Sequence, residues 1–450
     1  MRLATNRYGQ ITSSWTIEPT KERSVNITGI KGMNDILPVE IATWQFLERE
    51  AHRIFQTYGF TEIRVPVVEK TDLFCRSIGE TTDIVEKEMY TFSDKSGNSL
   101  TLRPEGTAPV MRSFIQQKLH TQDPVTKLYY LGPMFRYERP QKGRYRQFHQ
   151  IGVEAIGVDD PKIDAQILAM LCNYFSAVGI DDVELHINSL GCKECRPAYR
   201  QALIDYLQDR LGNLCSDCQR RSQTNPLRVL DCKVPACQEA TVTAPSMLDH
   251  LCGGCADHFS QVKDYLQSLN IDYTVNARMV RGLDYYSKTT FEMVTNSLGS
   301  QNAVAAGGRY DGLIADLGGP ALPGIGFAMG VERLVLMKGA DQLATERLPL
   351  FLAAMGQPAS DQAFLLMATL QRQGLRVEME YATKSLKAQM RRAGKFGARY
   401  VLILGEEELA RQMVTLRDMD AGTQQELPLE GLEEHLLKLL EETDLEPAAG

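Results

Sequence analysis

Apolar residues recur at helical spacing over residues 44–55, which predicts an amphipathic helix. Residues 61–69 read as a strand, and Pro66 assigns this strand to an edge or an interface, because proline has no N–H to give a sheet ladder. Residues 1–26 show neither pattern, and we expect an N-terminal extension without fixed structure there. The apolar positions of the helix are Trp44, Leu47, Ala51, Ile54 and Phe55.

The next stretch of the chain predicts an antiparallel sheet. Residues 89–94 and 99–105 flank a glycine-containing turn, as the two strands of a hairpin do. Residues 127–138 and 146–157 predict two further strands, joined by a loop that contains proline and glycine. Consecutive strands joined in this way pair antiparallel.

Two changes of pattern divide the rest of the chain. After a predicted helix at 161–178, a cysteine-rich and largely helical segment occupies about 190–271, and strand-like sequence resumes at 274–295. The segment 190–271 therefore reads as an insertion into a strand-rich domain. From about residue 347, strands and helices alternate over about 100 residues, which predicts a small α/β domain.

The composition is that of an ordinary soluble protein. The chain has 450 residues, 43% of them hydrophobic and 24% charged, and its formal net charge is −8. These values exclude collagen-like and fully disordered chains, and the mild acidity still permits local basic patches. No apolar run approaches the roughly 18 residues of a membrane span, so we expect a cytoplasmic protein with no membrane partner.

The loop over residues 136–146 is basic although the chain as a whole is acidic, because it holds five basic residues and one acidic residue. Arginines on adjacent strands grip phosphate oxygens, and the aromatic rings of Tyr137, Tyr145 and Phe148 offer flat faces to a base. The plainer alternative is a solvated hairpin loop. The basic helix predicted near 384–399 leaves the same choice between an RNA contact and a solvated face.

Three further stretches are candidates for a ligand site. Residues 103–107 place a carboxylate at a strand end, where it would hold an ammonium group or only form a turn. Residues 281–286 combine an arginine with paired tyrosines, as a phosphate-directed cation or as a tyrosine-rich strand edge. The glycines of 306–312 and 324–330 nearly match a dinucleotide fingerprint, and we expect them to let strand and helix approach a ligand that Arg333 faces.

Eight of the ten cysteines lie between residues 192 and 255, mostly in Cys-x-x-Cys pairs. They suffice for two tetrahedral zinc sites or, if only four take part, for one. Reduced cysteines without a metal are the alternative, and the spacing leaves both open. The eight are Cys192, Cys195, Cys215, Cys218, Cys232, Cys237, Cys252 and Cys255.

Together these stretches resemble the histidyl-tRNA synthetase family of class II aminoacyl-tRNA synthetases. Five segments carry the resemblance, in the order that the family has them: 61–69, 135–150, 281–292, 305–313 and 324–334. The resemblance implies an α+β fold with an antiparallel sheet, flanking helices and the helical cysteine-rich insertion. It further implies a class II catalytic domain over 27–345 with its insertion at about 190–271, and a C-terminal α/β anticodon-binding domain over 346–450.

The resemblance also implies roles for individual residues. Arg136 and Arg281 would place two positive charges on the α-phosphate of ATP, Arg333 would bind the far end of ATP, Phe148 would stack on adenine, and Glu138 would lie near its amino group. Histidine would be bound by Glu105, Thr107 and Gln150 at its α-amino group, by Glu154 and Tyr286 at its imidazole, and by Tyr285 and Tyr310 along the pocket. The tRNA would meet Arg139, Lys142, Arg144 and Arg146, and the basic helix adds Lys384, Lys387 and Arg391. Pro66 would lie in a dimer interface.

The implied activity is a histidine–tRNA ligase that uses ATP with Mg²⁺, binds L-histidine and tRNA(His), and forms a homodimer. The alternative is a regulatory, synthetase-like subunit of an ATP phosphoribosyltransferase. Such subunits lack the anticodon domain and often the histidine motifs, whereas this chain keeps residues 281–286 and an α/β segment from Arg347 onward. Both features favour the enzyme.

Overall fold

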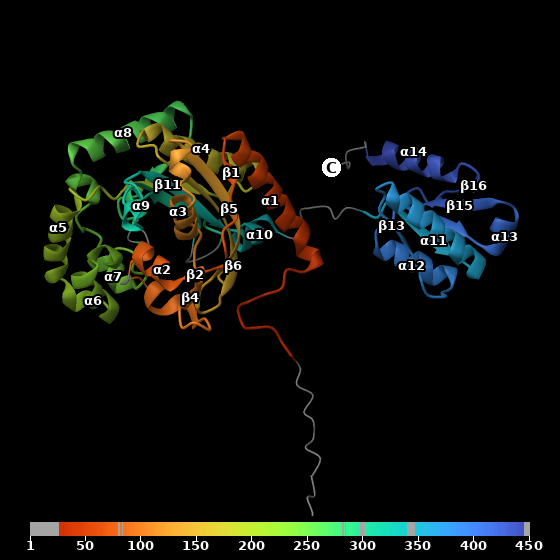
Figure 1. Ribbon diagram of the computed structural model, residues 1–450, viewed down its shortest axis with the longest axis horizontal. Helices are drawn as coiled ribbons and strands as arrows, with labels where there is room; N and C mark the ends of the chain where they lie inside the picture. Colours follow the sequence, from red (N-terminus) through yellow and green to blue (C-terminus); the bar gives the residue numbers. More distant parts are fainter. Residues whose placement is uncertain are drawn as a thin grey trace, which may run out of the picture. The chain divides into compact units, whose positions relative to one another are not determined.

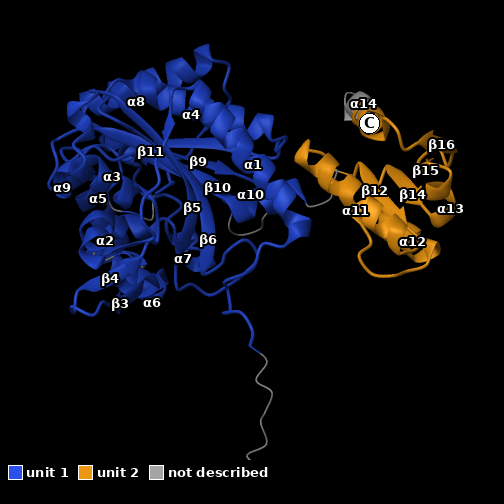
Figure 2. Ribbon diagram, turned by 45° about the vertical axis from the view of Figure 1, so that its right-hand side comes forward, with its two compact units in different colours: residues 1–340 blue, residues 341–450 orange. Residues whose placement is uncertain are grey.

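The computed structural model describes residues 27–79, 82, 84–280, 283, 285–297, 302–339 and 347–444. The chain forms two compact units, Met1–Ala340 and Asp341–Gly450 (Figure 2). The extension expected at 1–26 lies outside the described residues. Within the described part, no helix has the length and low polarity that crossing a bilayer requires.

The first unit is built on an eight-stranded sheet in the order β1-β5-β6-β11-β10-β9-β7-β8 (Figure 1). Its outermost pairs, β1 with β5 and β7 with β8, are parallel, and the five pairs between them are antiparallel. The predicted antiparallel sheet is therefore confirmed. The strands are β1 (Thr61–Glu62), β5 (Thr126–Phe135), β6 (Gln147–Ile156), β7 (Glu184–Ser189), β8 (Thr274–Val275), β9 (Ser287–Val294), β10 (Ala303–Arg309) and β11 (Gly324–Gly330).

Helices cover both faces of this sheet. The predicted helix near residue 44 is confirmed as α1 (Pro38–Thr57), and its apolar face packs with α4 (Pro161–Ala177) on one side of the sheet. On the other side, α3 (Thr107–Gln116) and α9 (Leu313–Asp316) pack against side chains of β5. Tyr129 faces the first of these cores and Tyr130 the second, as the two-residue period of a strand requires. Helix α10 (Val331–Lys338) follows directly after β11.

A small three-stranded sheet, β2-β4-β3, contains the predicted hairpin, with β2 (Val68–Lys70), β3 (Tyr90–Ser93) and β4 (Ser99–Leu102). The prediction of one strand over 61–69 was wrong. The chain pairs with β5 up to Ile63, where the Ile63 N–H donates to the Tyr129 carbonyl, and it then crosses to β4. Pro66 lies in the crossing, where no ladder hydrogen bond is needed. Helix α2 (Thr71–Ile78) and a short π-helix (Ile84–Glu88) follow.

The predicted insertion leaves the sheet after β7 and returns at β8. Figure 1 shows α5, α6 and α7 gathered as a lobe, which we call the cysteine lobe (residues 190–271). Strand was also expected throughout 274–295, and this was wrong, because Asn276–Met279 forms a turn between β8 and β9. The helices of the lobe are α5 (Arg196–Gln208), α6 (Ser216–Thr224), α7 (Pro235–Ala240) and α8 (Gly253–Ser268).

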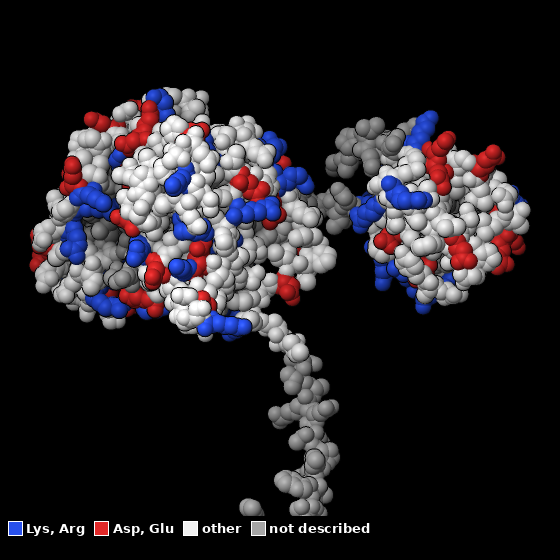
Figure 3. Space-filling model, viewed as in Figure 1, with Lys and Arg blue, Asp and Glu red and all other residues white. Residues whose placement is uncertain are grey.

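The second unit is a five-stranded sheet in the order β13-β12-β14-β15-β16 with helices around it. The expected α/β alternation is confirmed, whereas the strands β15 and β16 and the helix α14 were not predicted. Lys384, Lys387 and Arg391 are exposed on or just before α12, and Figure 3 shows basic side chains along this side of the unit. Its elements are β12 (Leu350–Ala354), α11 (Gln357–Arg372), β13 (Val377–Met379), α12 (Leu386–Lys395), β14 (Tyr400–Leu404), α13 (Glu406–Ala410), β15 (Met413–Asp418), β16 (Gln424–Pro428) and α14 (Leu432–Asp444).

Candidate active site

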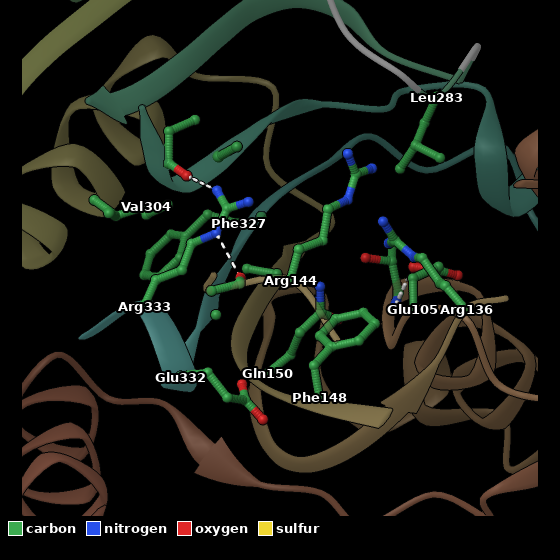
Figure 4. Close-up of a pocket in the computed structure, with 18 of the residues that line it drawn as sticks. Glu105, Arg136, Arg144, Phe148, Gln150, Leu283, Val304, Phe327, Glu332 and Arg333 are labelled. Atoms are coloured by element: carbon green, nitrogen blue, oxygen red, sulfur yellow. Dashed lines mark hydrogen bonds between the residues drawn. The ribbon is translucent and has the colours of Figure 1, made fainter. Parts of the chain in front are cut away.

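A cavity of about 280 Å³ opens over strands β6, β10 and β11 of the first unit (Figure 4). Its walls come from the segment before α3, the β5–β6 loop, the start of α10 and the chain before β9. Segments far apart in the sequence therefore meet at one site. The candidate residues that line it are Glu105, Thr107, Arg136, Glu138, Arg144, Phe148, Gln150, Tyr285, Tyr286, Tyr310 and Arg333.

Arg136 follows the last residue of β5 and is fixed on two sides. Its Nε donates to the Pro104 carbonyl at 2.8 Å, and its guanidinium lies 5.2 Å from the centroid of the Phe148 ring. The Glu138 carboxylate is 3.9 Å from Arg136 Nη1. A cation held in this way next to an aromatic face suits a nucleotide phosphate beside its base.

Two more guanidinium groups enter the cavity beside Arg136. Arg333, at the start of α10, donates to the carbonyl oxygens of Gly143 and Ala303 (Figure 4). Arg144, for which a contact with tRNA is predicted, lines the cavity and contacts the Glu138 carboxylate. Burial, together with the charges of Arg144 and Arg136, lowers the pKa of Arg333. The mutual repulsion of these cations would be relieved by an anion.

The carboxylates of the cavity are largely engaged by the protein. Glu105 accepts the backbone N–H groups of Thr107 and Ala108, at 2.7 and 2.8 Å, where α3 begins. Glu332, for which the sequence predicts no role, accepts the backbone N–H of His149 at 2.9 Å. Glu138 lies against two of the arginines, Arg136 and Arg144. Three guanidinium groups in one cavity suit a ligand that carries several phosphate oxygens.

A buried polar pocket lies at the inner end of the cavity. Glu154, on β6, is 1% exposed and accepts hydrogen bonds from the Thr107 hydroxyl at 2.7 Å and the Tyr310 phenol at 2.5 Å. Burial raises the pKa of Glu154 to about 8. The buried Oε1 atom of Gln150 has no hydrogen-bond partner among the described residues. The pocket thus offers an acceptor for a ligand N–H.

Glycine residues make room for this pocket. The sequence predicts that the glycines of β11 lie close to a ligand, and Gly326 and Gly330 line the cavity. A Cβ at Gly326 would also lie 2.2 Å from Glu154 Oε2 and 2.2 Å from the Val153 carbonyl oxygen. A Cβ at Gly324 would meet the Tyr310 ring at 2.2 Å. These glycines therefore admit the protein's own polar side chains.

Replacing Gly326 by alanine should lower the free energy of unfolding by about 1–3 kcal/mol, because the new methyl group overlaps a backbone carbonyl and a carboxylate. Gly330→Ala is a matched control on the same strand, since its Cβ would approach no heavy atom closer than 3.8 Å. Urea denaturation of both variants measures the difference. Equal stability of the two variants would show that β11 can accommodate a methyl group at position 326.

The other candidate residues are placed as follows. Arg281 lies outside the described residues. The rings of Tyr285 and Tyr286 contact each other at an interplanar angle of 48°, with centroids 4.7 Å apart. The Arg146 guanidinium covers the Tyr137 ring at 4.1 Å. The exposed candidates of this unit are Arg139 and Lys142 on the β5–β6 loop and Pro66 between β1 and β2.

Arg309, which sequence reasoning missed, anchors the floor of the site. It is fully buried, and it donates to Asp164 Oδ2 at 3.0 Å and to the Val158 carbonyl at 2.5 Å. Its neighbour along the chain is Tyr310, so the ion pair fixes the end of β10 where that phenol reaches Glu154. The sequence does contain a signal for this role, because Arg309 stands in a glycine-rich strand. A charge in a buried strand requires a buried partner.

Comparison with known proteins agrees with this arrangement. Residues 32–334 match the family described as histidyl-tRNA synthetase, and residues 350–439 match an anticodon binding domain. The chain is 76% identical over 414 residues to a histidine–tRNA ligase of Syntrophotalea carbinolica, covering 92% of this chain and 99% of that one. This chain belongs to the histidyl-tRNA synthetase family.

Solved structures of the same family share the fold. The crystal structure of apo histidyl-tRNA synthetase from S. aureus has a TM-score of 0.77 at 37% identity, and the match covers 91% of this chain and 99% of that one. A structure titled as an ATP phosphoribosyltransferase regulatory subunit/histidyl-tRNA synthetase from Bacillus halodurans has a TM-score of 0.61 at 19% identity, covering 84% and 98%. The second likeness concerns the fold alone.

Proposed function

We propose that this chain is a histidine–tRNA ligase, which activates L-histidine with ATP and transfers it to the 3′ end of tRNA(His). The proposal rests on one observation. A cavity lined by arginines and aromatic rings has the buried polar pocket of Glu154 at its inner end. A phosphate and an imidazole held at the two ends would bring the amino-acid carboxylate next to the α-phosphate.

In the ATP half of the site, Arg136 would hold the α-phosphate, Phe148 would stack on adenine, and Arg333 would bind the distal phosphates. Glu138 would lie near the adenine amino group. Mg²⁺ would neutralise the β- and γ-phosphates and be held largely by their oxygens, since most of the nearby carboxylates are already engaged.

In the histidine half, Glu105, Thr107 and Gln150 would bind the α-amino group, and the unpartnered Gln150 oxygen is suited to accept from an ammonium. Glu154 and Tyr286 would bond the two imidazole nitrogens, with Tyr285 and Tyr310 along the walls. A site that buries a partner for each nitrogen rejects amino acids that lack them.

The first step joins a histidine carboxylate oxygen to the α-phosphorus, and the bond from this phosphorus to the bridging oxygen breaks, so that pyrophosphate leaves. Negative charge builds up on the α-phosphate oxygens, where Arg136 and Arg281 would stabilise it. In the second step the 3′-hydroxyl of the terminal adenosine attacks the acyl carbon and AMP leaves. A phosphate oxygen of the adenylate would take the hydroxyl proton.

ATP–pyrophosphate exchange, measured with each amino acid in turn, tests the proposal. Exchange that depends on histidine alone is the expected result. Its absence would favour the regulatory subunit of an ATP phosphoribosyltransferase. The match of residues 350–439 to an anticodon binding domain argues for the ligase, since such a domain serves tRNA.

The tRNA would contact both units, through Arg139, Lys142, Arg144 and Arg146 in the first, and through α12 in the second. Replacing Lys384, Lys387 and Arg391 together by alanine should raise the KM for tRNA at least about tenfold, because each lost phosphate contact weakens binding. Exchange without tRNA should stay unchanged. The exposed Arg372→Ala, on α11, is the control. An unchanged KM for tRNA would show that α12 does not contribute to tRNA binding.

We further propose a homodimer that works in the cytoplasm, the compartment that supplies tRNA and ATP. Apolar side chains are exposed near the expected interface around Pro66, including Val68 at 37% and Phe92 at 45%. Exposed apolar groups of this kind mark association surfaces. Light scattering on the purified chain distinguishes a dimer from a monomer.

A further inference from the structure

We propose that the cysteine lobe binds two structural zinc ions, each through four cysteine thiolates. Eight cysteines form two separate groups, and within each group the four Sγ atoms all lie within 4.8 Å of one another. Four thiolates in tetrahedral arrangement are a common form of structural zinc site. Site A is Cys192, Cys195, Cys252 and Cys255, and site B is Cys215, Cys218, Cys232 and Cys237.

The sulfur–sulfur separations fit one metal ion per group. In site A, Cys192 Sγ lies 3.6 Å from Cys195 Sγ and 3.9 Å from Cys252 Sγ, and in site B the Cys215 and Cys232 sulfurs are 4.0 Å apart. A zinc ion with bonds of about 2.3 Å to four thiolates places these about 3.8 Å apart. Disulfides require about 2.05 Å, and all ten cysteines are free.

A polynuclear iron–sulfur cluster fits less well, because its cysteines bind different iron atoms and must stand farther apart. Backbone N–H groups also point at the sulfurs. The N–H of Cys252 donates to Cys195 Sγ at 3.1 Å, and that of Cys215 donates to Cys237 Sγ at 3.1 Å. Such hydrogen bonds stabilise the anionic sulfur that a metal requires.

Site A joins the two ends of the lobe. Cys192 and Cys195 stand where the chain leaves β7, and Cys252 and Cys255 stand at the start of α8, where it turns back toward the sheet. The turn before Cys192 admits only glycine, because Gly191 has φ +61° and a Cβ there would lie 2.8 Å from the Cys195 Cβ. Site B joins the start of α6 to α7 in the same manner.

The cysteine lobe needs such metal cross-links because its own hydrophobic core is small. The buried cluster of the lobe has eleven residues, and four of them are cysteines of the two sites. Within this cluster of buried residues, α6 contributes Cys218 alone and α7 contributes Cys237 alone. Small folds of this kind rely on metal or disulfide cross-links.

Site A also bears on the proposed function. Arg196, the residue after Cys195, donates to the backbone carbonyl of Tyr286, whose ring lines the cavity. Zinc in site A would therefore hold the wall of the histidine pocket. This consequence rests on the ligase proposal, whereas the metal content does not.

Elemental analysis of the full chain, purified reduced and without a metal-binding tag, tests the sites directly. Two zinc ions per chain are expected, and the reduced apo-protein should take up two equivalents on titration. A double serine variant of either site should retain one zinc. The variants are Cys192→Ser with Cys195→Ser, and Cys215→Ser with Cys218→Ser. The control, Cys75→Ser with Cys172→Ser, changes the two cysteines outside the sites and should retain two zinc ions.

Iron in place of zinc, fewer than two equivalents bound by the apo-protein, or full zinc content in the double serine variants would overturn the proposal. A thiol reagent gives a second measurement that does not depend on a variant's folding. Eight thiols should react slowly in the native chain and rapidly after chelation. If a chain that binds two zinc ions showed no histidine-dependent ATP–pyrophosphate exchange, the ligase proposal would be contradicted and the zinc proposal would not.

Discussion

The Arg136→Ala variant should form the adenylate about 10³-fold more slowly than the natural protein, with histidine affinity changed by less than about threefold. The guanidinium is held by the Pro104 carbonyl and the Phe148 ring, so it is already placed for charge that appears during the attack on phosphorus. Removing one fixed cation from a phosphoryl-transfer site commonly costs 10³-fold or more in rate. Pre-steady-state adenylate formation measures the rate, and equilibrium binding measures the affinity.

Arg139→Ala is the matched control, because Arg139 is an exposed arginine three residues away on the same loop. It should leave adenylate formation unchanged and weaken only transfer to tRNA. Equal losses of rate and of histidine affinity in Arg136→Ala would show a general distortion of the loop. Arg281→Ala should slow adenylate formation to a similar extent as Arg136→Ala, because both guanidinium groups are proposed to bind the same phosphate.

Much of the fold was predictable because its signals are local. The stripe from Trp44 to Phe55 has the helical period, and it became α1 with those residues buried. The strands β5 and β6 also follow from apolar runs on either side of a turn. Where local signals were weak the prediction failed. The segment around Pro66 looks like one strand because its apolar residues alternate, yet its two ends pair with different sheets.

The site was only partly predictable, because its contacts depend on register. Glu154 and Gly326 are paired across β6 and β11, and this pairing explains why position 326 carries no side chain. Nothing in the sequence alone shows that pairing. The same holds for Arg309 and Asp164, which are 145 residues apart and fully buried as an ion pair.

The Glu154→Gln variant should bind histidine about 10- to 200-fold more weakly, because the amide cannot ionise, whereas Glu154 can give up its proton when histidine binds and accept the imidazole N–H with a charged carboxylate. The same change should alter the pH dependence of stability. The folded-state pKa of Glu154, about 8, lies above its ordinary value of 4.5. Between these values the unfolded chain loses this proton first, so rising pH destabilises the fold until about pH 8.

Glutamine cannot ionise, so the stability of the variant should not decrease with pH for this reason. The stability of Glu154→Gln relative to the natural chain should therefore rise between pH 5 and pH 8 by up to a few kcal/mol, since each pKa unit corresponds to about 1.4 kcal/mol. Urea denaturation at both pH values measures the change, and Glu40→Gln, at an exposed position, is the control. A difference that is constant with pH would mean that Glu154 is ionised in the folded protein, and the imidazole would then meet a carboxylate that is already charged.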